Sequence, residues 1–275
     1  MKTAQIGMEI ILLASEIRDN ATSYQSNLFA DEAKVDFWIA DEQKVKYVVI
    51  GNSLFIFRED RGFFHIYFCS SSQDDLDKDL ADLQPQSAAW VVDLVGNHSQ
   101  INSLENLFSS HNFSPYASLK RLVLSAPAAE GKPDASYVGH ENVELAALSD
   151  ADQLLKLLET SFDPLKEQIP FKRELVLGIE KGSILVVRKD QVLAGLLYHE
   201  TMGITSILRY WLVSEHYRNR GIGSALMSRY LSLYPNVKRF MLWVLTDNVD
   251  AISKYRHYGF KEDSLVDIVM IRGAN

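Results

Sequence analysis

The sequence predicts an α+β protein of two domains, each a mixed sheet flanked by helices, and three observations support this. The chain has 275 residues, enough for two domains of about 100–150 residues each. Helical and strand patterns alternate, and their order repeats after about half the chain. A segment rich in Ala, Pro and Gly separates the two repeats, which is typical of a linker.

The first half, taken as a domain over 1–125, begins with helices and continues into strands. Glu9 and Glu16 flank its first apolar stretch, which favours an amphipathic helix over a signal peptide. A Gly51-Asn52 turn between two β-rich runs predicts a hairpin. The expected helices cover 8–30, 31–41, 74–83 and 99–110, and the expected strands cover 46–50, 53–58, 63–69, 88–95 and 119–124.

The second half, taken as a domain over 138–275, follows the linker at 126–137 and repeats the order of elements. Its expected helices cover 150–162, 171–181, 222–234 and 249–257, and its expected strands cover 143–147, 183–188, 192–199, 204–213, 239–245 and 264–271. An offset of 147 residues aligns Phe108 with Tyr255 and Phe113 with Phe260. Both halves are therefore expected to share one fold.

Composition narrows the class of protein. Hydrophobic residues make up 47% and charged residues 23%, the balance of a soluble globular protein. A net charge of −8 argues against broad nucleic-acid binding and mildly favours cationic substrates. No apolar run approaches the length of a membrane span. The single cysteine, Cys69, cannot form an internal disulfide, which fits a cytoplasmic protein.

The strongest chemical feature is a glycine-containing loop that follows a strand and opens an amphipathic helix. Its residues are Arg218, Asn219, Arg220, Gly221, Ile222, Gly223 and Ser224. Glycines let the backbone turn tightly and expose its N–H groups, and the helix N-terminus adds a partial positive charge. The loop is suited to a pyrophosphate, although the motif by itself also fits an ordinary glycine turn.

A second segment follows the next strand. It contains Asn248, Ala251, Tyr255, Gly259 and Phe260. By itself, Asn248 is a plausible helix cap, Gly259 a helix terminator and Tyr255 a partly buried core aromatic.

With both motifs in this order, residues 138–275 resemble the GNAT superfamily of N-acetyltransferases. Arg218, Gly221 and Gly223 match its (Arg/Gln)-x-x-Gly-x-(Gly/Ala) loop, and the second segment matches its Asn-x-x-Ala-x-x-x-Tyr-x-x-x-Gly-Phe pattern. The resemblance implies a mostly antiparallel mixed sheet. It also implies acetyl-CoA as co-substrate, but it does not identify the acceptor. Our leading hypothesis is direct acyl transfer, without a metal, to a primary amine of a small molecule within a ternary complex.

The resemblance also implies roles for individual residues. The loop 218–224 would bind the coenzyme A pyrophosphate, and the strand end at Leu212 and Val213 would hold the pantetheine arm. Asn248 would line the cofactor channel. Tyr255 would be the general acid, a function that contributes roughly 10²–10⁴ in rate.

No motif in the sequence identifies the general base. An alkylamine with the lysine reference pKa lies ~3.4 units from deprotonation at pH 7, a deficit of about 4.6 kcal/mol. Glu200 and Glu215 are the catalytic candidates, along with His199 and His216. Each also fits a solvated surface residue, and a chain of waters is an alternative to a single base.

The first half lacks both motifs. Its segment at 70–80 has four aspartates and neither a glycine pair nor an arginine, and Phe108 stands at the tyrosine position. We therefore expect a degenerate GNAT-like half without its own cofactor, the alternative being an unrelated accessory domain. For the whole chain, the alternatives are a non-catalytic acyl-CoA sensor and a protein or peptide acetyltransferase. A homodimer is also considered.

Overall fold

The computed structural model describes residues 1–40, 45–83, 88–125, 142–233 and 235–273. The chain divides into two units, Met1–Leu119 with Ser264–Asn275, and Lys120–Asp263. The expected linker at 126–137 lies outside the described residues, and the domain boundaries given above stay a prediction. The C-terminal segment from Ser264 packs with the first unit, although it follows the second along the chain.

The first unit is a mixed sheet with helices on both faces. Its elements are β1 (Lys2–Thr3), α1 (Gly7–Asp19), β2 (Gln25–Ser26), α2 (Glu32–Ala40), β3 (Val45–Ile50), β4 (Ser53–Asp60), β5 (Phe63–Ser70), α3 (Gln73–Ala81), β6 (Trp90–Asn97) and α4 (His98–Ser110). β7 (Ser114–Ser125) and β13 (Lys261–Arg272) run from one unit into the other. The strand order is β1-β3-β4-β5-β6-β13, in which only β5 and β6 are parallel neighbours.

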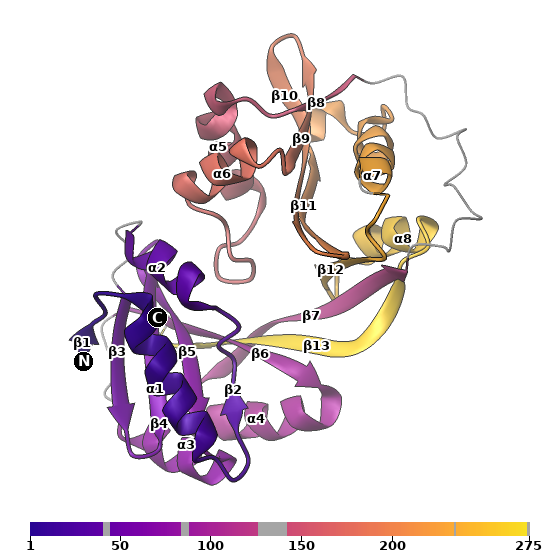
Figure 1. Cartoon of the computed structure of the whole chain (residues 1–275). Coiled ribbons are helices and arrows are strands. Elements are labelled where there is room, and N and C mark those ends of the chain that lie inside the picture. The colour runs from indigo at the N-terminus through magenta and orange to yellow at the C-terminus, as the bar shows by residue number, and fades with distance from the viewer. Residues whose placement is uncertain (41–44, 84–87, 126–141, 234, 274–275) are drawn as a thin grey trace. The chain divides into compact units, whose positions relative to one another are not determined.

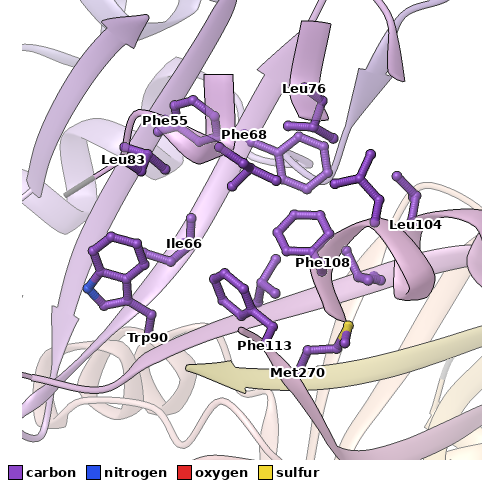
Figure 2. Packing of buried hydrophobic residues seen from close by; sticks show 14 of the residues in the cluster. Phe55, Ile66, Phe68, Leu76, Leu83, Trp90, Leu104, Phe108, Phe113 and Met270 are labelled. Carbon is purple, nitrogen blue, oxygen red and sulfur yellow. The ribbon is translucent and has the colours of Figure 1, made fainter. Parts of the chain in front are cut away.

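Continuous apolar runs in β4 and β5 supply the core of the first unit. Side chains alternate between the faces of a strand, so one run serves two cores. Phe55 and Phe68 pack against Phe108 of α4 on one face (Figure 2), whereas Leu54 and Ile56 pack against α1 and α2 on the other. Two covered faces explain why the strands lack the polar alternation of a half-exposed sheet.

The expected helix over 8–30 is wrong beyond Asp19. The Asn20 side chain donates to the carbonyl of Glu16 at 2.9 Å, which caps the end of α1. The chain then runs extended, and the N–H groups of Thr22 and Ser23 donate to the carbonyl of Ser71. The other elements expected among the described residues occur with their ends shifted by up to five residues, the largest shift being that of β7, which begins at Ser114 rather than Leu119.

The second unit repeats this plan. Its elements are β8 (Val143–Leu145), η2 (Leu148–Asp150), α5 (Ala151–Ser161), α6 (Lys172–Glu180), β9 (Ile184–Lys189), β10 (Val192–Met202), β11 (Thr205–Val213), η3 (Glu215–Tyr217), α7 (Ile222–Leu233), β12 (Arg239–Leu245) and α8 (Val249–His257). The strand order is β8-β9-β10-β11-β12, with β11 and β12 parallel. α5 and α6 cover one face of this sheet and α7 covers the other (Figure 1).

The ends of α4 and α8 show the repeat in atomic detail. The N–H of Phe113 donates to the carbonyl of Phe108, and the N–H of Phe260 donates to that of Tyr255, both at 3.1 Å. Asn112 and Gly259 adopt positive φ at the equivalent position, +66° and +90°. Both helices thus end in the same Schellman-type turn, at the 147-residue offset found in the sequence. The expectation of one fold in both halves is confirmed in these elements.

Candidate active site

The strands β11 and β12 pair along only part of their length. Their register runs from Thr205 opposite Arg239 to Leu208 opposite Leu242, and both strands continue beyond it. Next to this point β11 has one extra residue, Arg209. Its neighbours Leu208 and Tyr210 lie opposite two adjacent residues of β10. Such a β-bulge bends its strand and ends regular pairing. No described segment pairs with β11 on this side beyond the bulge, and we call the opening the β11–β12 gap.

The end of β11 offers backbone groups to this gap. The N–H of Ser214 donates to the carbonyl of Ala194 at 2.9 Å, so Ser214 faces β10. Because backbone direction alternates along a strand, Trp211 and Val213 face the gap, while Leu212 faces β10. Of the two residues predicted to hold the pantetheine arm, Val213 faces the gap and Leu212 does not. Trp211, which was not among the predicted residues, faces the gap as well.

The loop 218–224 enters α7 directly after η3. Asn219 and Gly221 have positive φ, +61° and +83°, a conformation for which glycine has no steric penalty. A side chain at Gly223 would begin 3.3 Å from the Trp211 ring, so the glycine permits close packing of α7 on β11. The first N–H groups of a helix lack intrahelical partners, which leaves those at 222–224 available to an anion.

Two arginines border the loop. Nε of Arg218 donates to the carbonyl of Val213 at 3.2 Å, which ties the loop to the end of β11. The guanidinium carbon of Arg220 lies 5.7 Å from the centre of the Tyr217 ring. Both arginines are exposed, so each presents positive charge where the helix N-terminus already favours an anion.

Tyr255 lies on the face of the sheet that α7 covers, and its ring packs against that of Trp211. Its ring centre is 5.4 Å from that of Trp211 and 5.9 Å from that of Phe260, and the residue is 8% exposed. The indole N–H of Trp211 donates to the carbonyl of Gly223 at 3.2 Å, which fixes the ring between β11 and α7. Burial raises the pKa of Tyr255, and the charge of Glu167 raises it further, so the phenol stays protonated at neutral pH.

The remaining predicted residues are scattered. Asn248 is an exposed N-cap, and its side chain accepts from the N–H of Ala251 at 3.1 Å. Glu200 lies within β10 rather than after the hairpin, because β10 extends to Met202, and it accepts from Nη1 of Arg209 at 2.7 Å. No hydrogen bond or ion pair in the described part of the chain joins Glu200 to Tyr255.

The other base candidates differ in exposure. Glu215 and His216 are exposed on η3. His199 is fully buried against Tyr230, with ring centres 5.1 Å apart, and burial lowers the pKa of His199 to about 4. A neutral histidine sealed in the core is not placed to take a proton from an acceptor.

One acidic residue outside the candidates predicted from the sequence has a pKa near neutral pH. Burial and the nearby Asp163 raise the pKa of Glu167 to about 7. Catalytic proton transfer is most efficient when the pKa lies near the working pH. No motif marks Glu167; only its position between two expected helices was visible in the sequence.

The first unit has the equivalent opening between β5 and β6. These parallel strands pair only at Phe64 with Trp90 and His65 with Val91. Here, however, a short segment of the same chain occupies the opening, because β2 pairs with the end of β5.

Asn27, next to β2, bridges the two parted strands. Its Nδ2 donates to the carbonyls of Ile66 and Asp93 at 3.0 and 3.1 Å, and its Oδ1 accepts from the N–H of Phe68 at 2.7 Å. Asn27 is buried, so these bonds are shielded from water. The backbone groups that stay open in the second unit are thus satisfied internally in the first.

We expect the substitution Asn27→Ala to lower the free energy of unfolding by about 2–4 kcal/mol, because it leaves several buried backbone groups without partners. Urea unfolding measures the loss, and hydrogen exchange at the Phe68 amide should accelerate. Asn102→Ala, at an exposed position of α4, is the matched control and should change stability little. Equal stability of the two variants would contradict the bridge.

The N-terminus of α3 also differs from that of α7. Asp75 accepts from the hydroxyls of Ser71 and Ser72, both at 2.6 Å, and from Nδ2 of Asn52 at 3.2 Å. These hydrogen bonds, that from Ser71 foremost, lower the pKa of Asp75 to about 2. A fixed negative charge therefore stands where a second pyrophosphate would have to bind.

Part of the second unit matches a known protein family. Residues 151–260 match the model of the Acetyltransferase (GNAT) family, a range that contains the loop, the β11–β12 gap and Tyr255. The second unit therefore contains a GNAT-family domain. No curated protein matches it in sequence.

Solved GNAT structures extend the likeness beyond the matched range. A GCN5-related N-acetyltransferase from Sphaerobacter thermophilus has a TM-score of 0.59 at 14% identity, over 80% of this chain and 76% of that one. A GNAT-family acetyltransferase from Colwellia psychrerythraea covers 98% of both chains, with a TM-score of 0.56 at 13% identity. A tandem GNAT protein from the clavulanic acid biosynthesis pathway has a TM-score of 0.53 at 11% identity, over 80% and 78%. The fold shared with GNAT proteins therefore includes the first unit.

Two further properties concern the described residues alone. None of their helices is long and apolar enough to cross a membrane. No group of three or more His, Cys, Asp or Glu side chains among them is arranged to hold a metal ion.

Proposed function

We propose that this protein is an acetyl-CoA dependent N-acyltransferase that acts on a primary amine of a small molecule by direct attack within a ternary complex. The β11–β12 gap is the observation that carries the proposal. The loop 218–224, which we call the anion loop, lies at one end of β11, and Tyr255 packs against Trp211, which faces the gap. GNAT membership supports acyl-CoA dependent acetyl transfer, and these residues support a working site.

The residues present fit coenzyme A. Backbone groups of Trp211 and Val213 face the gap and can pair with the amides of a pantetheine arm, as a further strand would. The positive φ of Gly221, with nothing within 4 Å of a Cβ built there, leaves room for a phosphate at the helix N-terminus. Arg218 and Arg220 add positive charge at the same end.

Acetyl-CoA supplies an acyl group activated as a thioester. The N–H groups on the gap edge of β11 can donate to the acyl oxygen as negative charge develops on it. Tyr255 holds a proton on its Oη, which it can donate to the leaving sulfur. Burial disfavours charged groups. It therefore raises the pKa of a thiol in this site, as it raises the pKa of the Tyr255 phenol.

Thiol release tests the function. Purified protein is mixed with acetyl-CoA and, in turn, ethanolamine, putrescine, tyramine and glycine methyl ester, and free coenzyme A is measured. The proposal expects release that depends on an amine and saturates with it. Binding of acetyl-CoA without release on any amine would favour the sensor, and release only with peptides would favour a protein acetyltransferase.

A further inference from the structure

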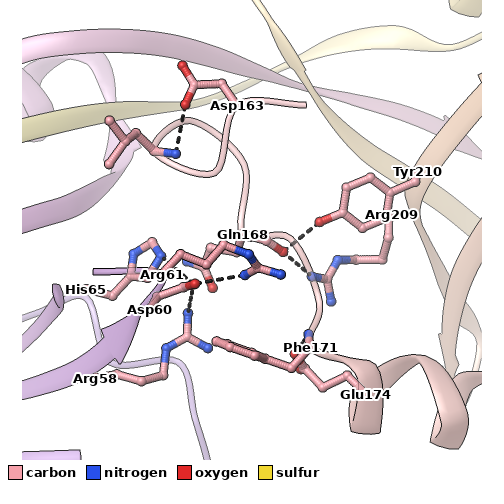
Figure 3. Close-up of polar contacts among 11 residues, drawn as sticks. Arg58, Asp60, Arg61, His65, Asp163, Gln168, Phe171, Glu174, Arg209 and Tyr210 are labelled. Atoms are coloured by element: carbon pink, nitrogen blue, oxygen red, sulfur yellow. Dashed lines mark hydrogen bonds and ion pairs between the residues drawn. The ribbon is translucent and has the colours of Figure 1, made fainter. Parts of the chain in front are cut away.

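The turn between α5 and α6 is fixed against β11 at the bulge. The carbonyl of Gln168 accepts from Oη of Tyr210 at 2.6 Å and from Nη2 of Arg209 at 3.5 Å (Figure 3). Ile169 is buried in the core that α5 and α6 form with the sheet. The turn therefore holds its position on this face, beside the strand whose pairing with β12 ends there.

Glu167 precedes Gln168 in this turn and is partly buried. Its N–H donates to the carbonyl of Asp163 at 3.0 Å, and its carboxylate accepts a hydrogen bond from the backbone of the same residue. The groups whose charges interact with it are Asp163 and Lys166 on its own turn, Tyr210 from β11 and Tyr255 from α8. Burial acts most strongly, so the carboxyl group titrates near neutral pH.

The elements that carry Glu167 and Tyr255 lie on opposite faces of the sheet. Tyr255 belongs to the core under α7 and α8, whereas the turn that carries Glu167 packs with α5 and α6. Burial raises the pKa of Tyr255 most, and the charge of Glu167 raises it further, so the two groups interact electrostatically. The pairing of β11 with β12 ends at Leu208, one residue before Arg209, which donates to the carbonyl of Gln168, the neighbour of Glu167.

We propose that Glu167 is the general base that deprotonates the acceptor amine; this inference rests on the proposed function. The Glu167 carboxylate takes one proton from the substrate ammonium. The nitrogen then bonds to the acyl carbon, the carbon–sulfur bond breaks, and the sulfur takes the proton of Tyr255. The second proton of the attacking nitrogen restores the phenol, and Glu167 releases its proton to water, so one proton leaves per turnover.

The substitution Glu167→Gln tests this assignment. With an amine that the wild type acetylates, kcat/KM should fall by roughly 10²–10⁴, and the limb of the pH profile with an apparent pKa near 7 should disappear. Acetyl-CoA binding by calorimetry should not change. With hydroxylamine, which is largely uncharged at pH 7 and needs no base, the variant should approach the wild type. Glu180→Gln, an exposed carboxylate near the end of α6, is the control and should keep the wild-type profile.

The outcomes separate two failures. No thiol release by wild type with any amine would overturn the proposed function and this inference together. A wild type that turns over, beside a Glu167→Gln variant with the same rate and pH profile, would overturn the inference alone. An equal loss with hydroxylamine and with charged amines would assign Glu167 a structural role and would also overturn it. Titration of the Glu167 carboxyl carbon by NMR should give a pKa near 7, and an ordinary carboxyl value would contradict the proposal.

Discussion

The substitution Gly221→Asp should weaken acetyl-CoA binding on the order of 10²-fold. Its side chain would project into the space at the N-terminus of α7 and place a negative charge beside the expected pyrophosphate. At a distance of about 5 Å and with partial screening by solvent, the repulsion between these charges amounts to about 2–4 kcal/mol. The positive φ of Gly221 adds about 1–2 kcal/mol of backbone strain. Isothermal titration calorimetry measures the loss.

Gly203→Asp separates the charge at the site from the strain. Gly203, in the turn between β10 and β11 of the same unit, also has positive φ and open space around it. The substitution at Gly203 should cause the same backbone strain, but it does not place a charge at the loop 218–224. The affinity of this variant for acetyl-CoA should therefore stay within about threefold of wild type. Equal losses in both variants would show that strain, not the anion site, reduces binding.

The substitution Tyr255→Phe should lower kcat by roughly 10²–10⁴ and leave acetyl-CoA affinity nearly unchanged. Phenylalanine keeps the ring contacts with Trp211 and Phe260 and removes only the hydroxyl. The proton for the leaving sulfur must then come from water. The measurement is steady-state thiol release at saturating acetyl-CoA, beside calorimetry of the same sample.

Tyr258→Phe is the matched control for this result. Tyr258 follows the same helix, and its ring also contacts Trp211, at 5.9 Å. Removal of its hydroxyl should change kcat by less than about threefold. A Tyr255→Phe enzyme that keeps its full rate would remove Tyr255 from the chemistry while leaving the fold assignment intact.

Local patterns in the sequence predicted most elements of the fold. Gly259 predicted the end of α8, and the structure confirms a positive φ there. The loop at 218–224 opens α7 as expected, since positions that need unusual backbone angles or close packing leave a glycine in the sequence. These signals are local because turns and helix ends are determined by a few neighbouring residues.

Long-range features were not predictable in the same way. Nothing local to residues 264–273 shows that β13 pairs with β6 of the first unit, because its apolar alternation fits any half-buried strand. The sequence predicts Asn27 only as a polar residue of a helix. Its role depends on β5 and β6, the two separated strands that it bridges in the structure. The same applies to Glu167, whose proton affinity depends on burial by residues distant in sequence.

We propose that the chain has a single cofactor site and that this site lies in the second unit. The stoichiometry of acetyl-CoA binding to the full chain tests this most directly. Calorimetry should give one site per chain. Asn27 fills the opening between β5 and β6 in the first unit, whereas the β11–β12 gap in the second unit stays open beside the anion loop. Two sites per chain, or one site untouched by Gly221→Asp, would contradict the claim.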